Sequence, residues 1–308
     1  MPGSSAVVGV AIHVGLVLLF PPLLLGIINK TKALFAGRLG PPILQPYHDL
    51  AKLLRKGTVL SRTTTWVFLA GPVVGLVTTG LAALFVPLGS HPSPLSFDGD
   101  FVFLAYLLAL GRFFTIAAAL DTGSAFEGMG GAREATFACL AEPALFFGFL
   151  VLARASGSYS LSGMLGPTVA ATWSTAGAAL AAVVVSWFVV LLAENSRIPF
   201  DDPNTHLELT MIHEVMVLDH SGPPFALILY SAAMKLFVFG ALVLGVAVPL
   251  DGLDPWFAWG LFLVALVTLA LAIGVVESVM ARLRLAQVPN LLVAATLISA
   301  FGAVLLVR

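Results

Sequence analysis

Eight runs of about 20 mostly apolar residues divide the chain, and each is long enough to cross a bilayer as a helix. They cover residues 6–28, 66–88, 101–120, 135–153, 168–193, 224–249, 256–281 and 289–307. Only 10% of the residues are charged and the mean hydropathy is +1.02, whereas roughly a quarter of the residues in a soluble domain are charged. We therefore predict an all-α polytopic membrane protein, organised as a single membrane domain over residues 1–308.

Prolines and the single cysteine add local expectations. Pro21-Pro22 should bend the first helix, and Pro143 should interrupt the fourth. Cys139 lies in an apolar run, which predicts a small buried hydrophobe and excludes a disulfide or a cysteine-based metal site. The first apolar run follows no basic segment, so we expect a retained helix and not a cleaved signal.

The distribution of Lys and Arg predicts how the chain is oriented. With the N-terminus outside, the inner loops hold 11 of the 15 Lys and Arg residues, and the outer side holds Arg154 and Arg308. Basic residues concentrate in cytoplasmic loops, so both termini should lie outside the cytoplasmic (inner) membrane. The formal net charge of -1 gives no basic excess that would favour nucleic acid as a partner.

Residues 194–220 form a densely charged loop between two apolar runs. Such density beside lipid is costly and indicates function. Pro199 and Pro203 prevent a helix from running through it, whereas a helical pattern extends from Thr205 to Asp219. The ionisable residues are Glu194, Arg197, Asp201, Asp202, His206, Glu208, His213, Glu214, Asp219 and His220. The three histidines recur every seven residues, close to two helical turns, so they could share one face.

The first inner loop, 29–65, contains a predicted amphipathic helix at residues 45–57. Its leucines form an apolar stripe, and Lys52, Arg55 and Lys56 face water or lipid headgroups. A plain interfacial anchor is one interpretation of this helix. Asp49 favours a further role, because an anchor gains little from an acid at the membrane edge.

Two cations lie inside apolar runs. Arg112 and Lys235 are near the middle of their helices, where a lone cation costs several kcal/mol, so each needs a partner or a hydrated cavity unless its side chain reaches the interface. Glu134 and Glu142 are eight residues apart and can share one face of the fourth helix. A series of acids, His and Lys that runs inward is what a proton path requires. Glu127 is expected to be a solvated loop acid.

Other chemistries have less support. The donors His206, His213 and His220 with Glu208 or Glu214 could bind a metal, but the HExxH spacing is absent. The sequence has no G-x-S-x-G nucleophile motif and no Gly-rich phosphate loop. We therefore predict no catalytic, cofactor-binding or metal-ligating residue on this chain.

Several segments, in order, resemble one known family. Residues 40–53 (GPPILQPYHDLAKL) and 194–201 (ENSRIPFD) resemble the quinone-chamber membrane subunit, known as subunit 1, of respiratory complex I. Residues 106–114 (YLLALGRFF), 120–134 (LDTGSAFEGMGGARE) and 141–143 (AEP) resemble more closely the homologous subunit of group 4 membrane-bound NiFe hydrogenases, the formate hydrogenlyase subunit 4 type. Lys235 also resembles a lysine of the hydrogenase branch. The segment after Asp201 departs from the complex I pattern, and His206 stands where that branch carries an acid.

The resemblance implies a subunit that anchors a peripheral redox arm and carries charge changes into an ion path. It implies hydrogenase-like large and small subunits, an iron–sulfur subunit and antiporter-like membrane subunits as partners. A NiFe centre and iron–sulfur clusters are expected on those partners, with none on this chain. The ion-coupling residues that resemblance and charge together suggest are Asp49, Arg112, Glu134, Glu142, Glu194, Arg197, Asp201, His206, Glu208, His213, Glu214 and Lys235.

Two other functions remain open at this point. The scaffold could be the quinone-site subunit of a complex I-type dehydrogenase, although the altered loop after Asp201 disfavours it. A free-standing ion carrier is less consistent with the sequence, because no internal repeat is visible. In every case the loops 29–65 and 194–220 should form one docking surface, with Arg38 and Arg197 paired to Asp49, Asp201 or Asp202.

Overall fold

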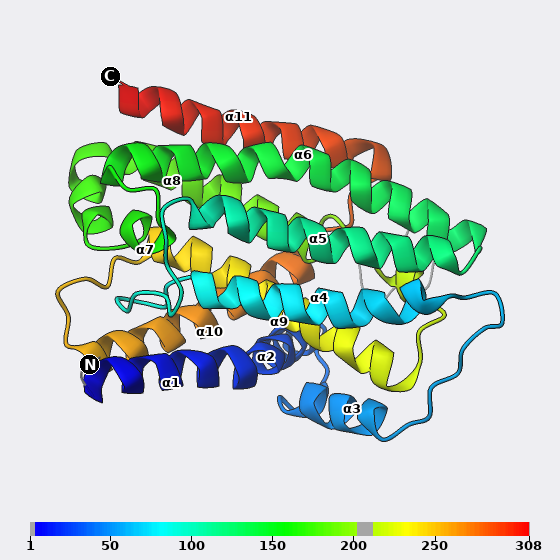
Figure 1. The fold of residues 1–308 in the computed structure, drawn as a ribbon. Helices are drawn as coiled ribbons and strands as arrows, with labels where there is room; N and C mark the ends of the chain where they lie inside the picture. The colour runs from blue at the N-terminus through cyan, green and yellow to red at the C-terminus, as the bar shows by residue number, and fades with distance from the viewer. Residues whose placement is uncertain (1–3, 202–211, 308) are drawn as a thin grey trace.

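The computed structural model describes residues 4–201 and 212–307, and in these ranges the chain is almost entirely helical (Figure 1). The membrane-length helices are α4 (Trp66–Phe85), α5 (Asp100–Asp121), α6 (Ala125–Ser156), α8 (Thr168–Glu194), α9 (Gly222–Ala247), α10 (Pro255–Val279) and α11 (Val288–Val307). The shorter elements are α1 (Ser4–Leu19), α2 (Pro21–Phe35), α3 (Gln45–Leu54), α7 (Leu161–Met164), η1 (Glu214–Val217) and η2 (Leu285–Gln287).

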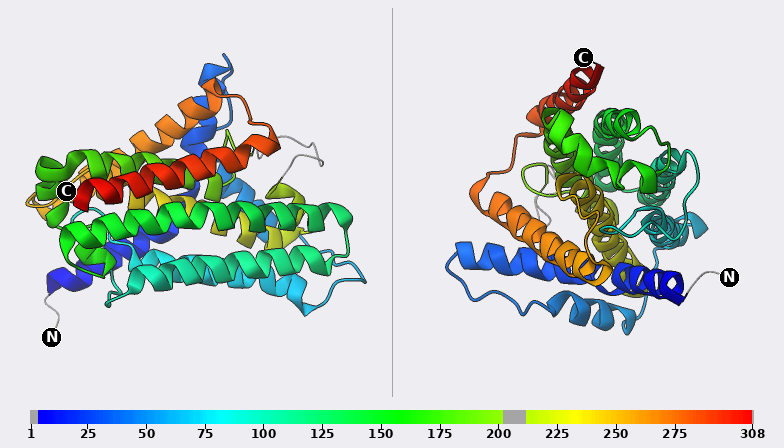
Figure 2. Two further views of the ribbon diagram at one scale, coloured as in Figure 1. Left: turned by 90° about the horizontal axis from the view of Figure 1, so that it is seen from above. Right: turned by 90° about the vertical axis from the view of Figure 1, so that its left-hand side faces the viewer.

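Counting spans confirms the polytopic prediction. Within residues 4–201 and 212–307, seven helices are long and apolar enough to cross a membrane, and α1 with α2 makes an eighth if the bent pair is one span. The bend of 46° falls at Pro21-Pro22, as predicted, because proline at the first helical position starts a new helix but cannot continue the previous one. Both chain ends lie at the same end of the bundle, as an even number of spans requires (Figures 1 and 2).

Helix starts at the loops are fixed by side-chain caps. The Thr65 hydroxyl accepts the Val67 N–H at the start of α4, and the Asp121 carboxylate accepts both the Thr65 N–H at 2.6 Å and its hydroxyl at 2.8 Å. Asp254 caps α10 by accepting the N–H groups of Trp256 and Phe257. These caps satisfy backbone donors that lipid could not satisfy.

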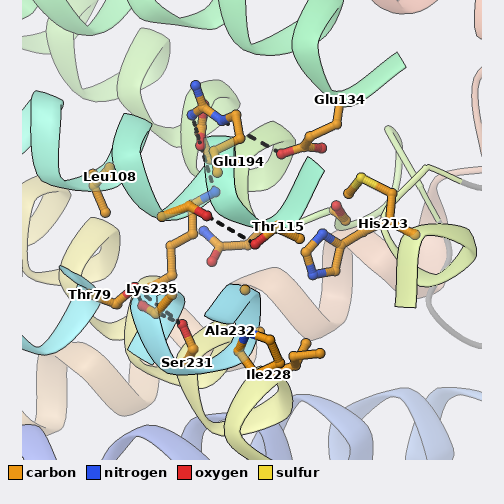
Figure 3. A pocket seen from close by; sticks show the side chains of 18 residues that line it. Thr79, Leu108, Thr115, Glu134, Glu194, His213, Ile228, Ser231, Ala232 and Lys235 are labelled. Atoms are coloured by element: carbon orange, nitrogen blue, oxygen red, sulfur yellow. Dashed lines mark hydrogen bonds and ion pairs between the residues drawn. The ribbon is translucent and has the colours of Figure 1, made fainter. Parts of the chain in front are cut away.

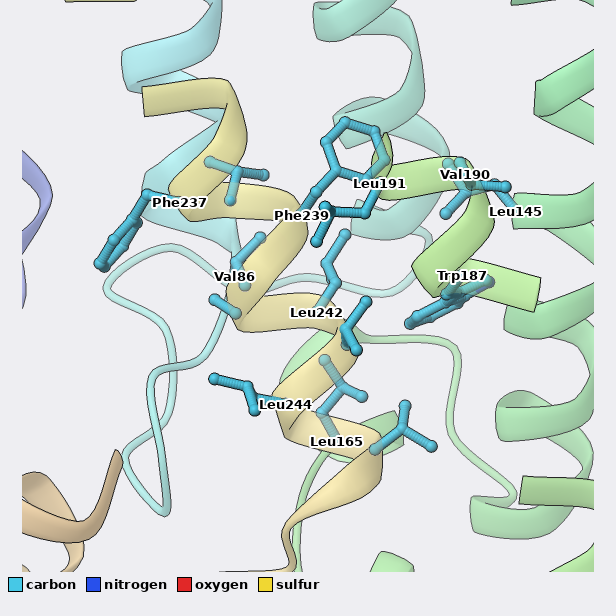
Figure 4. Packing of buried hydrophobic residues seen from close by; sticks show 14 of the residues in the cluster. Val86, Leu145, Leu165, Trp187, Val190, Leu191, Phe237, Phe239, Leu242 and Leu244 are labelled. Carbon is cyan, nitrogen blue, oxygen red and sulfur yellow. The ribbon is translucent and has the colours of Figure 1, made fainter. Parts of the chain in front are cut away.

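The core lies between α6, α8 and α9 (Figure 4). Trp187 of α8 is fully buried against Gly148 of α6, where any larger residue would meet the indole ring. Burial among helices in lipid gains little hydrophobic free energy, so close packing around small residues holds such interfaces together. This packing brings charged residues from within α5, α6 and α9 together with Glu194 at the end of α8.

Several local expectations were wrong. The helix predicted from Thr205 to Asp219 is not an α-helix in its described part: residues 214–217 form one 3-10 turn, and residues 205–211 lie outside the described ranges. Cys139 is exposed on α6, not buried, because in lipid an apolar helix face need not point inward. Pro143 does not interrupt α6, which is continuous from Ala125 to Ser156. Glu127 is buried and accepts the Asp219 N–H at 3.1 Å, so it is not a solvated loop acid.

The amphipathic helix of the first inner loop is confirmed as α3, and it ends at Leu54. None of its residues is buried. It lies along one side of the bundle near the end opposite the termini (Figure 1).

Candidate functional site

Arg112 of α5 is the centre of a cluster of charged side chains inside the bundle. Figure 3 labels three other members of this cluster, Glu134, Glu194 and Lys235. Its Nη1 donates to Glu142 Oε1 of α6 at 2.7 Å, and its Nη2 donates to both carboxylate oxygens of Glu194 of α8 at 2.7 and 2.8 Å. Its Nε lies 3.7 Å from Glu134 Oε1. The partner that a cation within an apolar run requires is therefore present, and the alternative that Arg112 reaches for the interface is wrong.

Lys235 of α9 completes the cluster from the opposite side. Its Nζ lies 2.7 Å from Glu194 Oε2, so Glu194 is shared between two cations. The Glu194 side chain is 5% exposed, whereas that of Glu142 is 42% exposed. A carboxylate this deeply buried is stable only when paired, and removing either partner leaves an uncompensated charge.

The cluster is not electrically balanced when every group is ionised. Three carboxylates and two cations leave one formal negative charge on the cluster as a whole. Arg112, Glu134, Glu194 and Lys235 line a cavity of about 80 Å³, whereas the more exposed Glu142 does not line it. A cavity of this size has room for water, and the polar side chains in its wall can bind it. The arrangement can therefore hold or exchange a proton or a cation in addition to its own fixed charges.

A second charged group, which the sequence analysis missed, lies around Glu277 at the end of α10. Lys32 Nζ is 2.8 Å from Glu277 Oε2, and Arg197 Nη1 is 3.4 Å from Oε1. The Glu277 side chain is fully buried. Glu277 lies within the apolar run 256–281, so the rule that selected Arg112 and Lys235 would have selected it as well.

Asp201 connects this region to the loop that follows. Arg282 lies 2.7 Å from Asp201 Oδ1, and Asp201 Oδ2 accepts the backbone N–H groups of Ile212 at 2.9 Å and His213 at 3.3 Å. Arg197 pairs with Glu277, which the sequence analysis did not name, and Asp201 pairs with Arg282. The other candidate partner, Asp202, lies outside the described residues. Arg282, which follows α10 in the sequence, therefore holds the loop that follows α8.

A larger cavity of about 470 Å³ lies beside the first and is lined partly by this loop. Arg197, Asp201 and Glu214 line it, together with His213 and His220. His220 is buried, stacks on Phe68 with ring centroids 3.9 Å apart, and contacts the Phe68 carbonyl through Nε2 at 3.2 Å. Burial lowers the pKa of His220.

His213 lines both cavities. Burial lowers the pKa of its imidazole, and the nearby carboxylates of Glu134, Asp201 and Glu194 partly offset that effect. His213 and His220 do not share a helical face, since the backbone between them forms a 3-10 turn.

The predicted site residues thus fall into four groups. Arg112, Glu134, Glu142, Glu194 and Lys235 converge in one cluster, and Arg197, Asp201, His213 and Glu214 lie around the larger cavity. Asp49 is exposed on α3, accepts a hydrogen bond from Gln45 at 2.9 Å and is not among the residues that line these two cavities. His206 and Glu208 lie outside the described residues. Within the described ranges, no three His, Cys, Asp or Glu side chains are grouped as a metal site would need.

Known proteins resemble this chain along nearly its whole length. It is 34% identical over 278 residues to formate hydrogenlyase subunit 4 of Escherichia coli (strain K12), covering 88% of this chain and 89% of the relative. It is 33% identical over 234 residues to hydrogenase-4 component C of the same organism, covering 76% and 73%. A chain of the membrane-bound sulfane sulfur reductase, an archaeal respiratory membrane complex, has the same fold with a TM-score of 0.80 at 22% identity, covering 98% of this chain and 99% of that one.

The sequence profile of the family described as NADH dehydrogenase matches residues 8–308. Together with the identity to the two hydrogenase subunits, this match confirms the resemblance that the sequence motifs indicated. The chain therefore belongs to the NADH dehydrogenase (NADHdh) family of multi-pass membrane proteins.

Proposed function

We propose that this chain is the membrane anchor and ion-coupling subunit of a membrane-bound, hydrogenase-like respiratory complex. The observation that carries the proposal is the Arg112–Glu194–Lys235 network, which places paired charges from three helices inside the bundle. The similarity of the chain to formate hydrogenlyase subunit 4 and hydrogenase-4 component C supports the hydrogenase-like branch.

Coupling follows from how Glu194 is shared. A charge change near the end of α8 alters how strongly Glu194 attracts Arg112 and Lys235, because opposite charges at these distances in a low-dielectric site interact strongly. Protonation of Glu194 would weaken its ion pairs with Arg112 and Lys235. Both cations would then be stabilised by pairing with other anions. Glu134 and Glu142 are in place to receive Arg112, so charge can be passed along the cluster.

The partners and cofactors are part of the proposal. Hydrogenase-like large and small subunits with an iron–sulfur subunit would supply the NiFe centre and the clusters, and antiporter-like membrane subunits would complete the ion path. Residues 1–308 act as one membrane domain in the cytoplasmic membrane. The loop 29–65 and the loop 195–221 would face the cytoplasm, since most Lys and Arg lie on that side.

Copurification in mild detergent tests the assembly. We expect the tagged chain to bring down an iron–sulfur subunit and at least one antiporter-like subunit. Charge reversal at Arg55 and Lys56, both exposed beside α3, should release the soluble arm and retain the membrane subunits. The matched control reverses the charge of Arg154, which is exposed in the last turn of α6. This change should affect neither the soluble arm nor the membrane subunits. Isolation of an active, ion-translocating monomer would contradict the proposal.

The larger cavity favours a second candidate function, a quinone site. Its volume of about 470 Å³ falls in the range of small-molecule pockets, and Arg197, Asp201 and His220 supply polar groups among apolar ones. A photoreactive quinone added to the purified complex separates the two functions. Labelling of residues in this cavity, competed by plain quinone, would favour the quinone-site function, and we expect none.

A further inference from the structure

His213 occupies the boundary between the two cavities. The residues that line both are Asn195, Ser196, His213, Ile228 and Ala232. Of these, only the imidazole gains and loses a proton near neutral pH. Among the described residues, His213 is therefore the titratable side chain that both cavities share.

The charged groups around His213 favour reversible protonation of its imidazole. Glu134 of α6, Glu194 of α8 and Asp201 of the loop attract a proton to the ring, whereas Lys235 of α9 and burial oppose it. The Arg112 cluster carries one uncompensated negative charge when fully ionised, so a protonated His213 would neutralise it. A small change in the charge of the cluster can thus decide the protonation state of the ring.

The loop fixes the position of His213 from outside the cluster. Asp201 accepts the N–H groups of Ile212 and His213, and Arg282 holds Asp201 at 2.7 Å. The ring is therefore carried on an anchored backbone while its side chain remains partly exposed to the cavities. Figure 3 shows the ring on the same side of the smaller cavity as the Glu134 carboxylate.

We propose that His213 passes protons between the larger cavity and the Arg112 cluster, a role that rests on the proposed ion-coupling function. A proton that water in the larger cavity carries as hydronium binds the unprotonated ring nitrogen, and that water is left neutral. The other ring nitrogen then gives its proton, through water in the smaller cavity, to the Glu134 carboxylate. One proton enters and one leaves, and the ring returns to its starting state by exchanging tautomers.

The test uses the whole complex in proteoliposomes, with proton uptake and electron transfer measured together. His213→Gln keeps a polar side chain of similar length but cannot carry a proton, so uptake per electron should fall at least about tenfold with electron transfer retained. Lys235→Met is the reference for a damaged cluster. Asp98→Asn, at an exposed acid in the loop at the opposite end of the bundle, is the control and should match the parent.

Chemical rescue separates proton transfer from packing. His213→Ala leaves space next to a cavity of about 470 Å³ that can admit a small ring. Imidazole should restore uptake, and pyrazole, which has the same shape but is not protonated near neutral pH, should not. Equal rescue by both rings would mean that the side chain only fills space, and the proposal would fall.

The remaining outcomes are also decisive. Parent-like uptake in His213→Gln with loss in Lys235→Met would overturn the role of His213 and leave the coupling function standing. Parent-like uptake in both variants would overturn the coupling function itself. Failure of both His213 variants to assemble would identify the ring as a packing element and would count against proton transfer.

Discussion

Lys235 of α9 and Glu194 of α8 form an ion pair of 2.7 Å within the helix bundle, and the same carboxylate is held from the other side by Arg112. Glu194 ends its helix, so it lies where the loop after α8 meets the buried cluster. One carboxylate therefore links the loop to three helices, and its charge state affects all of them.

Glu194→Gln should destabilise the protein more than Lys235→Met. Loss of Glu194 leaves Lys235 without its anion, whereas loss of Lys235 leaves Glu194 paired with Arg112. Breaking a buried pair costs about 3–5 kcal/mol, so Glu194→Gln should lower the apparent Tm of the purified complex markedly. The double variant should regain part of that loss, since neither charge is then left alone.

Glu142→Gln is the matched control for this comparison. The Glu142 carboxylate also pairs with Arg112, but its side chain is 42% exposed. The variant should therefore lose no more than about 1 kcal/mol of stability. A larger loss at Glu142 than at Glu194 would show that burial does not set the relative strength of these two pairs.

Glu277→Gln should loosen the loop at residues 195–201. The change removes the shared anion of Lys32 and Arg197 at a fully buried position. Hydrogen exchange of this loop should rise, because a backbone segment that loses its anchor opens more readily. Asp98→Asn, at an exposed loop acid, should leave the exchange unchanged. Unchanged exchange in Glu277→Gln would refute the anchoring role.

The lowered pKa of His220 predicts that the segment around it loses stability at acidic pH. Burial lowers its pKa below the ordinary value of about 6.5, so the folded state holds the neutral ring. The unfolded state then binds more protons, and the contribution of His220 to stability is complete above about pH 6.5 and is lost as the pH falls through the folded pKa. The protection factors of residues 212–221, which compare the exchange rate with the intrinsic rate at the same pH, should therefore fall on acidification. The variant His220→Gln should show a weaker pH dependence, whereas His48→Gln should behave like the parent.

Topology can be tested by cysteine labelling after Cys139→Ser removes the exposed native thiol. Lys56→Cys should react only from the cytoplasmic side and Asp98→Cys only from outside, since the loops that carry them lie at opposite ends of the helices (Figure 1). The reverse pattern would overturn the orientation drawn from the Lys and Arg distribution.

The sequence was sufficient to predict the spans, the bend at Pro21-Pro22 and the need of Arg112 and Lys235 for partners. Each of these follows from a local rule: length of apolar run, proline geometry, or the cost of a charge in lipid. The identity of the partners could not be predicted, because it depends on how α5, α8 and α9 cross and at what depth their residues meet.

Other errors have the same origin. Cys139 was expected to be buried, but hydropathy does not distinguish a lipid-facing position from a core position when both neighbours are apolar. The α-helix expected up to Asp219 gives way in its described part to a 3-10 turn, where the Asp201 carboxylate accepts the N–H groups of Ile212 and His213. These hydrogen bonds to the Asp201 side chain compete with the backbone hydrogen bonds of a helix. They are tertiary contacts across the loop, which the periodicity of the sequence does not encode.

The central claim is that the cluster around Arg112 couples electron transfer to ion movement. The most direct measurement is the number of protons or sodium ions taken up per electron by proteoliposomes that contain the whole complex. Glu134→Gln, Glu142→Gln and Lys235→Met should each assemble and transfer electrons, and each should take up far fewer ions per electron than the parent. Uptake equal to the parent in all three variants would mean that these residues are structural ion pairs, and the coupling account would be wrong.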